Sequence, residues 1–327
     1  MLVKRKILNH NSIRIDSLRI RLPLNLADNI DISIFDTYSE INNNTAEIDT
    51  TIQKSKHKEY FLSETKKVKL SIQNVRVSGT LNQECLIILL NSKFIGSRYF
   101  DGIFIENIHD IYLELMSLNA FHVDFETFLQ LDCTDIDIKF DEEMNQDEWN
   151  LLLNSFKRST KASPHANKGY LPFPPTTSNP LQNGLQYSDR KKATISRPFM
   201  KLYWKGGELL SNSLDFYNEN LFHLFNEEDI TDVVRIEATI KNKNHASSLG
   251  IKSTKLISLL KLSESELENA FRQIIGKYID NKSKLKTLET NSSTAKITAN
   301  TQIILNSLSV LLYDLNLTIE CAVSRLT

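Results

Sequence analysis

The sequence is short of the residues that several common sites require. Its 327 residues include three cysteines, Cys85, Cys133 and Cys321, which are widely spaced and form no Cys-x-x-Cys pair. We therefore expect neither a zinc ribbon nor a dithiol redox site. We do expect a reducing compartment. The nine glycines include no Walker-type loop for phosphate binding, which argues against a P-loop nucleotide hydrolase.

Long apolar runs are missing as well. The first six residues include Lys4, Arg5 and Lys6, but residues 9–11 read Asn-His-Asn, where a signal peptide needs an apolar stretch. The most apolar late segment, 303–319, is interrupted by Asp314 and four asparagine or serine residues, which a bilayer-spanning helix tolerates poorly. We therefore predict no membrane span and a cytoplasmic protein.

Charge is balanced overall but not locally. The net charge is −1, yet the segment from Lys157 to Lys205 holds ten basic residues and one acidic residue, Asp189. Six of the seven prolines lie between 164 and 198, so we predict an extended basic loop at about 157–198. Loops of this length are uncommon unless they bind something, and local positive charge attracts a polyanion such as DNA. A solvated basic loop without a partner is the plain alternative.

Periodicity predicts an α+β protein with a central antiparallel sheet, helices packed on one face and a helical C-terminal part. Residues 28–44 read as helix or loop, Glu142 and Glu143 as an acidic turn, and Ser263 with Glu266 as a capping box. We expect a main domain at 1–250 and a helical region at 251–327, which either binds DNA separately or packs on the sheet. The expected strands are 17–26, 68–72, 75–77, 85–90, 135–141, 199–205 and 233–241, and the expected helices are 107–118, 147–156, 263–280 and a stripe at 304–319.

Three of the expected strands repeat one design, in which apolar residues alternate with polar or charged ones. Since successive side chains point to opposite faces of a strand, each polar set shares a surface. The polar sets are Asp135, Asp137, Lys139 and Asp141; Lys201, Tyr203 and Lys205; and Arg235, Glu237, Thr239 and Lys241. If the strands are neighbours, carboxylates, a phenol and ammonium groups converge on the open side of the sheet. Solvated sheet faces show the same alternation.

Such a surface has the groups needed for phosphodiester chemistry. The carboxylates of Asp137, Asp141 and Glu237 are hard oxygen ligands that suit Mg²⁺ or Mn²⁺. Tyr203 is a candidate nucleophile, but a tyrosine with a pKa of about 10 is weakly nucleophilic at neutral pH. Lys201, Lys205 or the metal is expected to help its proton leave.

Several segments resemble the rolling-circle replication initiators of plasmids and single-stranded DNA phages, in particular the filamentous-phage gene II/X-like group. The most specific part is a lysine-flanked tyrosine, KLYWK, followed at a distance by an Arg-x-Glu strand, RIEATIK. The resemblance covers most of residues 16–251. It is carried by DSLRIRLPLNL (16–26), DIDIKFD (135–141), RPFMKLYWKGGEL (197–209) and VRIEATIKNKNHASSLGI (234–251), with NKGY (167–170) and GLQYSDRKKAT (184–194) between them.

The resemblance implies an HUH-like endonuclease fold that nicks and rejoins origin or single-stranded DNA in the cytoplasm of a bacterial host, with host polymerase and helicase as partners. Tyr203 then forms the covalent 5′-phosphotyrosyl adduct, Lys201 and Lys205 assist it, and Asp137, Asp141 and Glu237 form the metal site. No His-hydrophobe-His metal motif is present, and the nearest segment, His122-Val123-Asp124, reads as a turn. The expected DNA contacts are Lys168, Arg190, Lys191, Lys192, Arg197, Arg235 and Lys241.

The alternatives that stay open concern the tyrosine and the class of protein. Tyr170, Tyr187 and Tyr217 are rival tyrosines, and Tyr187 is the strongest because it lies in the basic loop. A relaxase of a mobile element would use the same chemistry. A non-catalytic origin- or operator-binding protein would use Tyr203 only to stack on a base, and a metal-dependent nuclease would use activated water instead.

Overall fold

The computed structural model describes residues 12–31, 37–41, 48–52, 58–61, 67–78, 81–159, 171–173, 184–187, 200–225 and 227–279. Its centre is a nine-stranded sheet in the order β10-β11-β12-β13-β9-β1-β7-β6-β5, in which every neighbouring pair is antiparallel. The predicted α+β class with a large antiparallel sheet is confirmed. The sheet strands are β1 (Arg14–Pro23), β5 (Lys58–Phe61), β6 (Lys67–Ser78), β7 (Leu81–Asn91), β9 (Asp132–Glu143), β10 (Leu171–Phe173), β11 (Gly184–Tyr187), β12 (Met200–Trp204) and β13 (Val233–Ile240).

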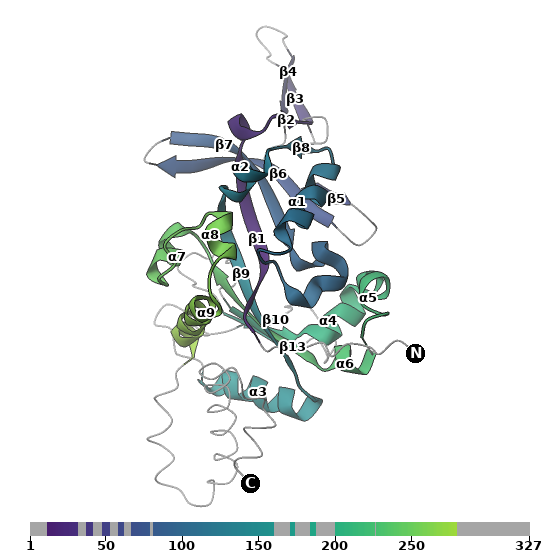
Figure 1. Cartoon of the computed structure of the whole chain (residues 1–327). Helices are drawn as coiled ribbons and strands as arrows, with labels where there is room; N and C mark the ends of the chain where they lie inside the picture. The colour runs from purple at the N-terminus through teal and green to yellow at the C-terminus, as the bar shows by residue number, and fades with distance from the viewer. Residues whose placement is uncertain are drawn as a thin grey trace, which may run out of the picture.

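The remaining elements surround this sheet (Figure 1). Two small two-stranded sheets pair β2 (Asn29–Ile30) with β8 (Phe121–His122) and β3 (Thr37–Ile41) with β4 (Ile48–Ile52). Among the described residues, no helix is both long and apolar enough to span a bilayer. The helices are η1 (Leu24–Leu26), η3 (Ser92–Asp101), α1 (Ile108–Ser117), α2 (Phe125–Leu129), α3 (Gln146–Ser159), α4 (Lys205–Asn212), α5 (Leu214–Asn220), α6 (Glu227–Thr231), α7 (Lys243–Ser248), α8 (Leu256–Leu260) and α9 (Glu264–Tyr278).

One face of the sheet is apolar and carries the main core. The alternating apolar residues of β1, β9, β12 and β13 pack there against buried residues of α1, α2, α3, α8 and α9. The apolar stripe of α9 buries Leu267, Phe271 and Ile274, and its predicted capping box of Ser263 and Glu266 is present. Helices α8 and α9 thus belong to the same core as the sheet. In this part of the predicted C-terminal region, the helices pack on the sheet, which is one of the two alternatives left open by the sequence. The stripe at 304–319 lies outside the described residues.

The other face is not left open along its whole length, contrary to the prediction of helices on one face only. A second cluster of buried apolar residues lies over one end of it, and Tyr99 of η3, Leu209 of α4 and Phe216 of α5 are among its members. In Figure 1, α4 and α5 lie on the side of the central strands opposite α8 and α9. Gly206 of α4 packs so closely on α6 that a Cβ there would lie 2.0 Å from the carbonyl oxygen of Ile230.

Several predicted boundaries are corrected by the structure. Part of the segment 28–44 is strand, namely β2 and β3, rather than helix or loop. Glu142 and Glu143 lie in β9 and not in a turn. The predicted loop 157–198 supplies β10 and β11, which extend the sheet beyond β12. Sequence patterning missed them because strands of three and four residues are too short to show a period.

Candidate functional site

The three strands that carry the predicted chemistry are neighbours in the sheet. Tyr203 of β12 lies opposite Arg235 of β13, and Arg235 lies opposite Asp141 of β9. Two residues along, Lys201 lies opposite Glu237. Directly opposed residues in antiparallel strands share a face, so the predicted common surface for the tyrosine, the lysine and the carboxylates is confirmed.

Tyr203, Glu237 and Lys201 form one hydrogen-bonded chain. The Tyr203 hydroxyl donates to Glu237 Oε1 at 2.5 Å, and Lys201 Nζ donates to Glu237 Oε2 at 2.5 Å. Tyr203 is only 6% exposed and Glu237 4%, so the expectation that the phenol lies on an open face is wrong. Burial and the Glu237 carboxylate raise the pKa of Tyr203 well above its usual value, which keeps the phenol protonated and bonded to the carboxylate.

Lys205 lies near the tyrosine but not on its strand. It begins α4, where its Nζ sits 5.5 Å from the centre of the Tyr203 ring and 2.5 Å from Glu208 Oε2. Burial alone would lower the pKa of Lys205, but the Glu208 carboxylate raises it above its usual value. Lys205 is therefore a fixed positive charge beside the ring, held by an ion pair within its own helix.

The three carboxylates predicted as metal ligands do not converge. Asp141 accepts two hydrogen bonds from Arg235, at 2.6 and 2.9 Å, whereas Asp137 accepts from Ser17 at 2.8 Å and Thr239 at 2.5 Å. Across the residues that the structure describes, no group of three or more acidic, histidine or cysteine side chains is close enough to hold one ion. Because each carboxylate is engaged by its own donors, the trio Asp137, Asp141 and Glu237 does not fit a shared metal.

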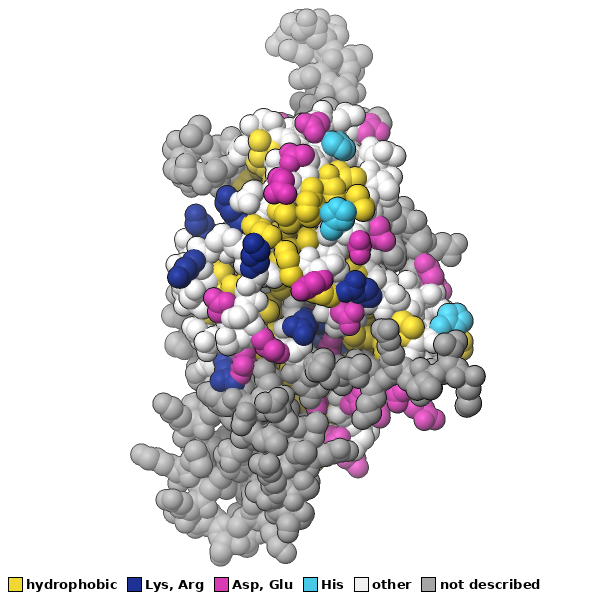
Figure 2. Space-filling model, in the orientation of Figure 1, with side chains coloured by type: hydrophobic (Ala, Val, Ile, Leu, Met, Phe, Trp, Pro, Cys, Tyr) yellow, Lys and Arg dark blue, Asp and Glu magenta, His cyan; other side chains and the backbone are white. Residues whose placement is uncertain are grey.

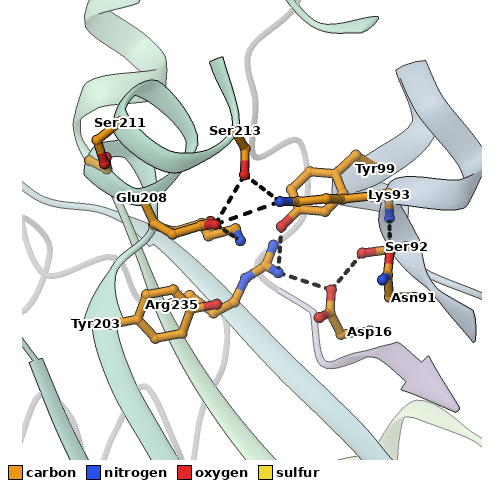
Figure 3. A network of polar contacts seen from close by, with 12 residues as sticks. Asp16, Asn91, Ser92, Lys93, Tyr99, Tyr203, Glu208, Ser211, Ser213 and Arg235 are labelled. Atoms are coloured by element: carbon orange, nitrogen blue, oxygen red, sulfur yellow. Dashed lines mark hydrogen bonds and ion pairs between the residues drawn. The ribbon is translucent and has the colours of Figure 1, made fainter. Parts of the chain in front are cut away.

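Arg235 belongs to a buried ionic network rather than to a DNA-binding surface. Its guanidinium is 0% exposed and also donates to Asp16 at 2.9 Å and to the Tyr99 hydroxyl at 2.9 Å (Figure 3). Burial would raise the pKa of Asp16, but Arg235 and Lys139 lower it well below the usual value. The predicted contact between Arg235 and DNA is therefore wrong, since the guanidinium is buried and donates to Asp16, Asp141 and the Tyr99 hydroxyl.

A second part of the network fastens α4 and α5 over the sheet. Lys93 of η3 donates to the hydroxyl of Ser213 at 2.5 Å and lies 3.6 Å from Glu208 (Figure 3). Burial would raise the pKa of Glu208, but Lys205 and Lys93 lower it to about 2. This covered end explains why Tyr203 is buried, which the alternation of its own strand could not reveal.

Farther along the same face, the polar surface opens into a pocket of about 310 Å³. Lys241, predicted to contact DNA, and Lys201 and Asp137 line it. Asp135 and Thr239, which belong to the predicted polar sets, line it as well. The sequence patterns did not single out the remaining polar lining residues, although the alternation of residues 17–26 already placed two of them on one face. They are Ser17, Arg19, Lys69 and Asn91.

Two of the rival tyrosines, Tyr187 and Tyr217, lie in the described part of the chain, and both are buried. Tyr187 lies in β11 opposite Met200, so it faces the apolar core, where its ring packs 5.5 Å from that of Tyr278. Its placement in the basic loop was wrong, and it cannot share a surface with Tyr203. Tyr217 is buried in the second apolar cluster. The other predicted residues outside the described part of the chain are Tyr170, Lys168, Arg190, Lys191, Lys192 and Arg197.

His122 and a group of exposed lysines lie elsewhere on the described surface, outside the lining of this pocket. His122 lies in strand β8 and not in the predicted turn, and it contacts Asp28, 3.1 Å away. Within the described part of the chain it belongs to no group of three potential metal ligands. Exposed lysines gather around α7 and α8, where Figure 2 shows basic side chains, while apolar side chains gather over α1 and α2. The lysines are Lys243, Lys252, Lys255 and Lys261.

No family model matches the chain, and comparisons with curated proteins and with solved structures found no significant match.

Proposed function

We propose that this protein nicks a single DNA strand and rejoins it through a covalent phosphotyrosine on Tyr203, as an initiator of rolling-circle replication. The observation that carries the proposal is the hydrogen bond from the Tyr203 hydroxyl to Glu237, beside a cation-lined pocket. A nucleophile bonded to a carboxylate base is the arrangement expected for covalent catalysis. The segments that resemble gene II/X-like initiators supply β1, β9, β12 and β13, which lie side by side around this bond.

The reaction assigns one role to each member of the chain. Tyr203 Oη attacks the phosphorus while its proton passes to Glu237 Oε1, the bond to the 3′ oxygen breaks, and that oxygen leaves as a hydroxyl after taking a proton from solvent. Lys201 offsets the negative charge that builds on the phosphoryl oxygens. The phosphotyrosyl bond conserves the energy of the cleaved linkage, so a 3′-hydroxyl can later reverse the attack without a nucleotide cofactor. A host polymerase extends the free 3′ end in between, with a host helicase opening the duplex.

A divalent ion remains a prediction that no step above depends on. In the described structure the carboxylates predicted to bind it are held apart by Arg235, Lys201 and two hydroxyl groups. Running the nicking reaction with Mg²⁺, with Mn²⁺ and with a chelator tests the requirement directly. Loss of activity in the chelator alone would show that ligands outside these carboxylates, or a rearrangement of them, complete a metal site.

The deciding experiment is capture of the covalent intermediate. The full chain is incubated with a labelled library of single-stranded oligonucleotides and Mg²⁺ or Mn²⁺, and denaturing electrophoresis separates any protein–DNA adduct. We expect an adduct that maps to Tyr203 by peptide mass, its loss in Tyr203→Phe, and retention of oligonucleotide binding in that variant. Cleavage without an adduct would indicate a hydrolytic nuclease, and neither cleavage nor adduct would remove the proposal.

A non-catalytic DNA-binding protein is the second candidate, because one observation favours it. Tyr203 is buried and its pKa is raised by burial and by Glu237, so a phosphate reaches its hydroxyl only after the covering residues move. If Tyr203 is structural, Tyr203→Phe leaves oligonucleotide affinity within twofold and no adduct forms with any probe. The same electrophoresis thus separates the two candidates.

A further inference from the structure

The pocket is assembled from strands that are distant in sequence but adjacent in the sheet. Ser17 and Arg19 come from β1, Asp135 and Asp137 from β9, and Lys241 follows β13. Lys69 of β6 and Lys201 of β12 complete its charged lining. Its four cations face two carboxylates, so the charged lining carries a net charge of +2 when all six groups are ionised. An anionic ligand is therefore favoured, and about 310 Å³ is at the small end of ligand pockets, enough for one nucleotide unit.

Backbone irregularities surround this pocket. The pairing of β1 with β9 shifts register twice, between Ile15 and Ser17 and between Ser17 and Arg19. Asp135 has a φ of +47° and is one of two described non-glycine residues with a positive φ. Its amide donates to the carbonyl oxygen of Lys241 at 3.0 Å, and its carboxylate contacts Arg19 at 3.4 Å and Lys241 Nζ at 3.8 Å. Bulges and strained residues concentrate at binding sites, so these two observations point to a ligand independently of charge.

Lys201 connects the pocket to the tyrosine. Its side chain lines the pocket, 22% exposed, while its Nζ bonds to the buried Glu237. Neither Glu237 nor Tyr203 lines the pocket. An anion in the pocket therefore competes with Glu237 for the ammonium group of Lys201. A change in that ion pair reaches the Tyr203 hydroxyl through the Glu237 carboxylate, to which both groups donate.

We propose that the pocket binds a phosphate group of single-stranded nucleic acid, and that this binding turns Lys201 away from Glu237 and so primes Tyr203. This inference rests on the proposed function and adds to it that binding of the substrate activates Tyr203. Arg19 and Lys241 supply the phosphate contacts, and Asp135 keeps both side chains directed into the pocket. The binding step does not depend on nicking, so it can be tested separately.

Binding is measured by fluorescence anisotropy with labelled pentathymidylate, with thymidine monophosphate and inorganic phosphate as competitors. A charge-assisted contact contributes enough that Lys241→Gln and Arg19→Gln should each weaken pentathymidylate binding by about tenfold or more. Each variant should also reduce the dependence of affinity on salt. The control is Lys261→Gln, because Lys261 is exposed at the end of α8, which packs on the apolar face; its affinity should stay within twofold. Competition by free monophosphate as strong as by the oligonucleotide would make a free nucleotide the ligand and overturn the nucleic-acid assignment.

Coupling to the tyrosine is measured by NMR of protein labelled at the ring carbon that bears the tyrosine hydroxyl, with Tyr203→Phe to assign the signal. Saturating pentathymidylate should shift the Tyr203 signal in the native protein and leave it unmoved in Lys201→Gln. If pocket variants bind as tightly as the native chain, or the Tyr203 signal does not respond, the inference fails even where an adduct forms. If pentathymidylate binds the pocket and shifts the Tyr203 signal but no adduct forms, the strand-transfer function is rejected and the phosphate site in the pocket is still supported.

Discussion

Replacing Arg235 by methionine should lower the free energy of unfolding rather than weaken a DNA contact. The guanidinium is 0% exposed and donates four hydrogen bonds, two of them to Asp141 at 2.6 and 2.9 Å and one each to Asp16 and the Tyr99 hydroxyl at 2.9 Å. Removing one partner of a buried ion pair costs about 3–5 kcal/mol. Since Lys139 Nζ stays 3.2 Å from Asp141, we expect a loss at the lower end, about 3 kcal/mol.

Urea unfolding followed by tryptophan fluorescence measures this loss. With an unfolding slope of about 3 kcal/mol/M, the midpoint should fall by about 1 M. The matched control is Lys241→Met, which removes a cation that is 15% exposed at the pocket and should cost no more than about 1 kcal/mol. The reasoning is refuted if Arg235→Met keeps the native midpoint and loses oligonucleotide affinity as Lys241→Met does, because Arg235 would then reach the nucleic acid.

Acid titration of the same variant provides a second check. Burial would raise the pKa of Asp16 and Asp141, but Arg235 lowers both below the ordinary value of 3.8. Groups with a lowered pKa contribute stability that is complete above their unfolded pKa and is lost as the pH falls toward the folded one. The native protein should therefore lose stability steeply below about pH 4, and Arg235→Met should lose less over that interval. Equal slopes for the two proteins would contradict the assignment.

Three further substitutions test separate parts of the structure. Gly184→Ala should cost about 1–3 kcal/mol and disturb the tyrosine, because a Cβ there would lie 2.8 Å from the Cβ of Tyr203; an unchanged melting curve would refute the close approach. Lys205 lowers the pKa of Glu208 from 4.5 to about 2 despite the burial of this carboxylate, so its ion pair stabilises the native protein in full above about pH 4.5 and is lost toward about pH 2. Glu208→Gln should remove this contribution to stability. Acid unfolding followed by circular dichroism measures the loss, and an unaltered acid transition would argue against it. Ser263→Ala should cost about 1 kcal/mol by removing the cap of α9, and no loss in thermal unfolding would mean that this helix end is stabilised by packing alone.

Alternation was the reliable guide to the central strands. The polar and apolar sets of β9, β12 and β13 face the sides that the sequence predicts, because the side-chain period of a strand is fixed by backbone geometry. The capping box of Ser263 and Glu266 is equally local and was also correct. The short strand β11 was missed, since its four residues carry too little pattern, and with it the sequence misplaced Tyr187.

The sequence by itself determined which residues share a surface: Tyr203, Lys201 and Glu237 had to face the same way once their strands paired. Only the tertiary structure decided which of them meet solvent. The covering of one end of the sheet by η3, α4 and α5 depends on contacts between residues far apart in the chain, such as Lys93 with Glu208. Those contacts bury Arg235 and Tyr203 and leave Lys201 at the border of the pocket, because burial depends on what packs above a strand and not on the strand itself.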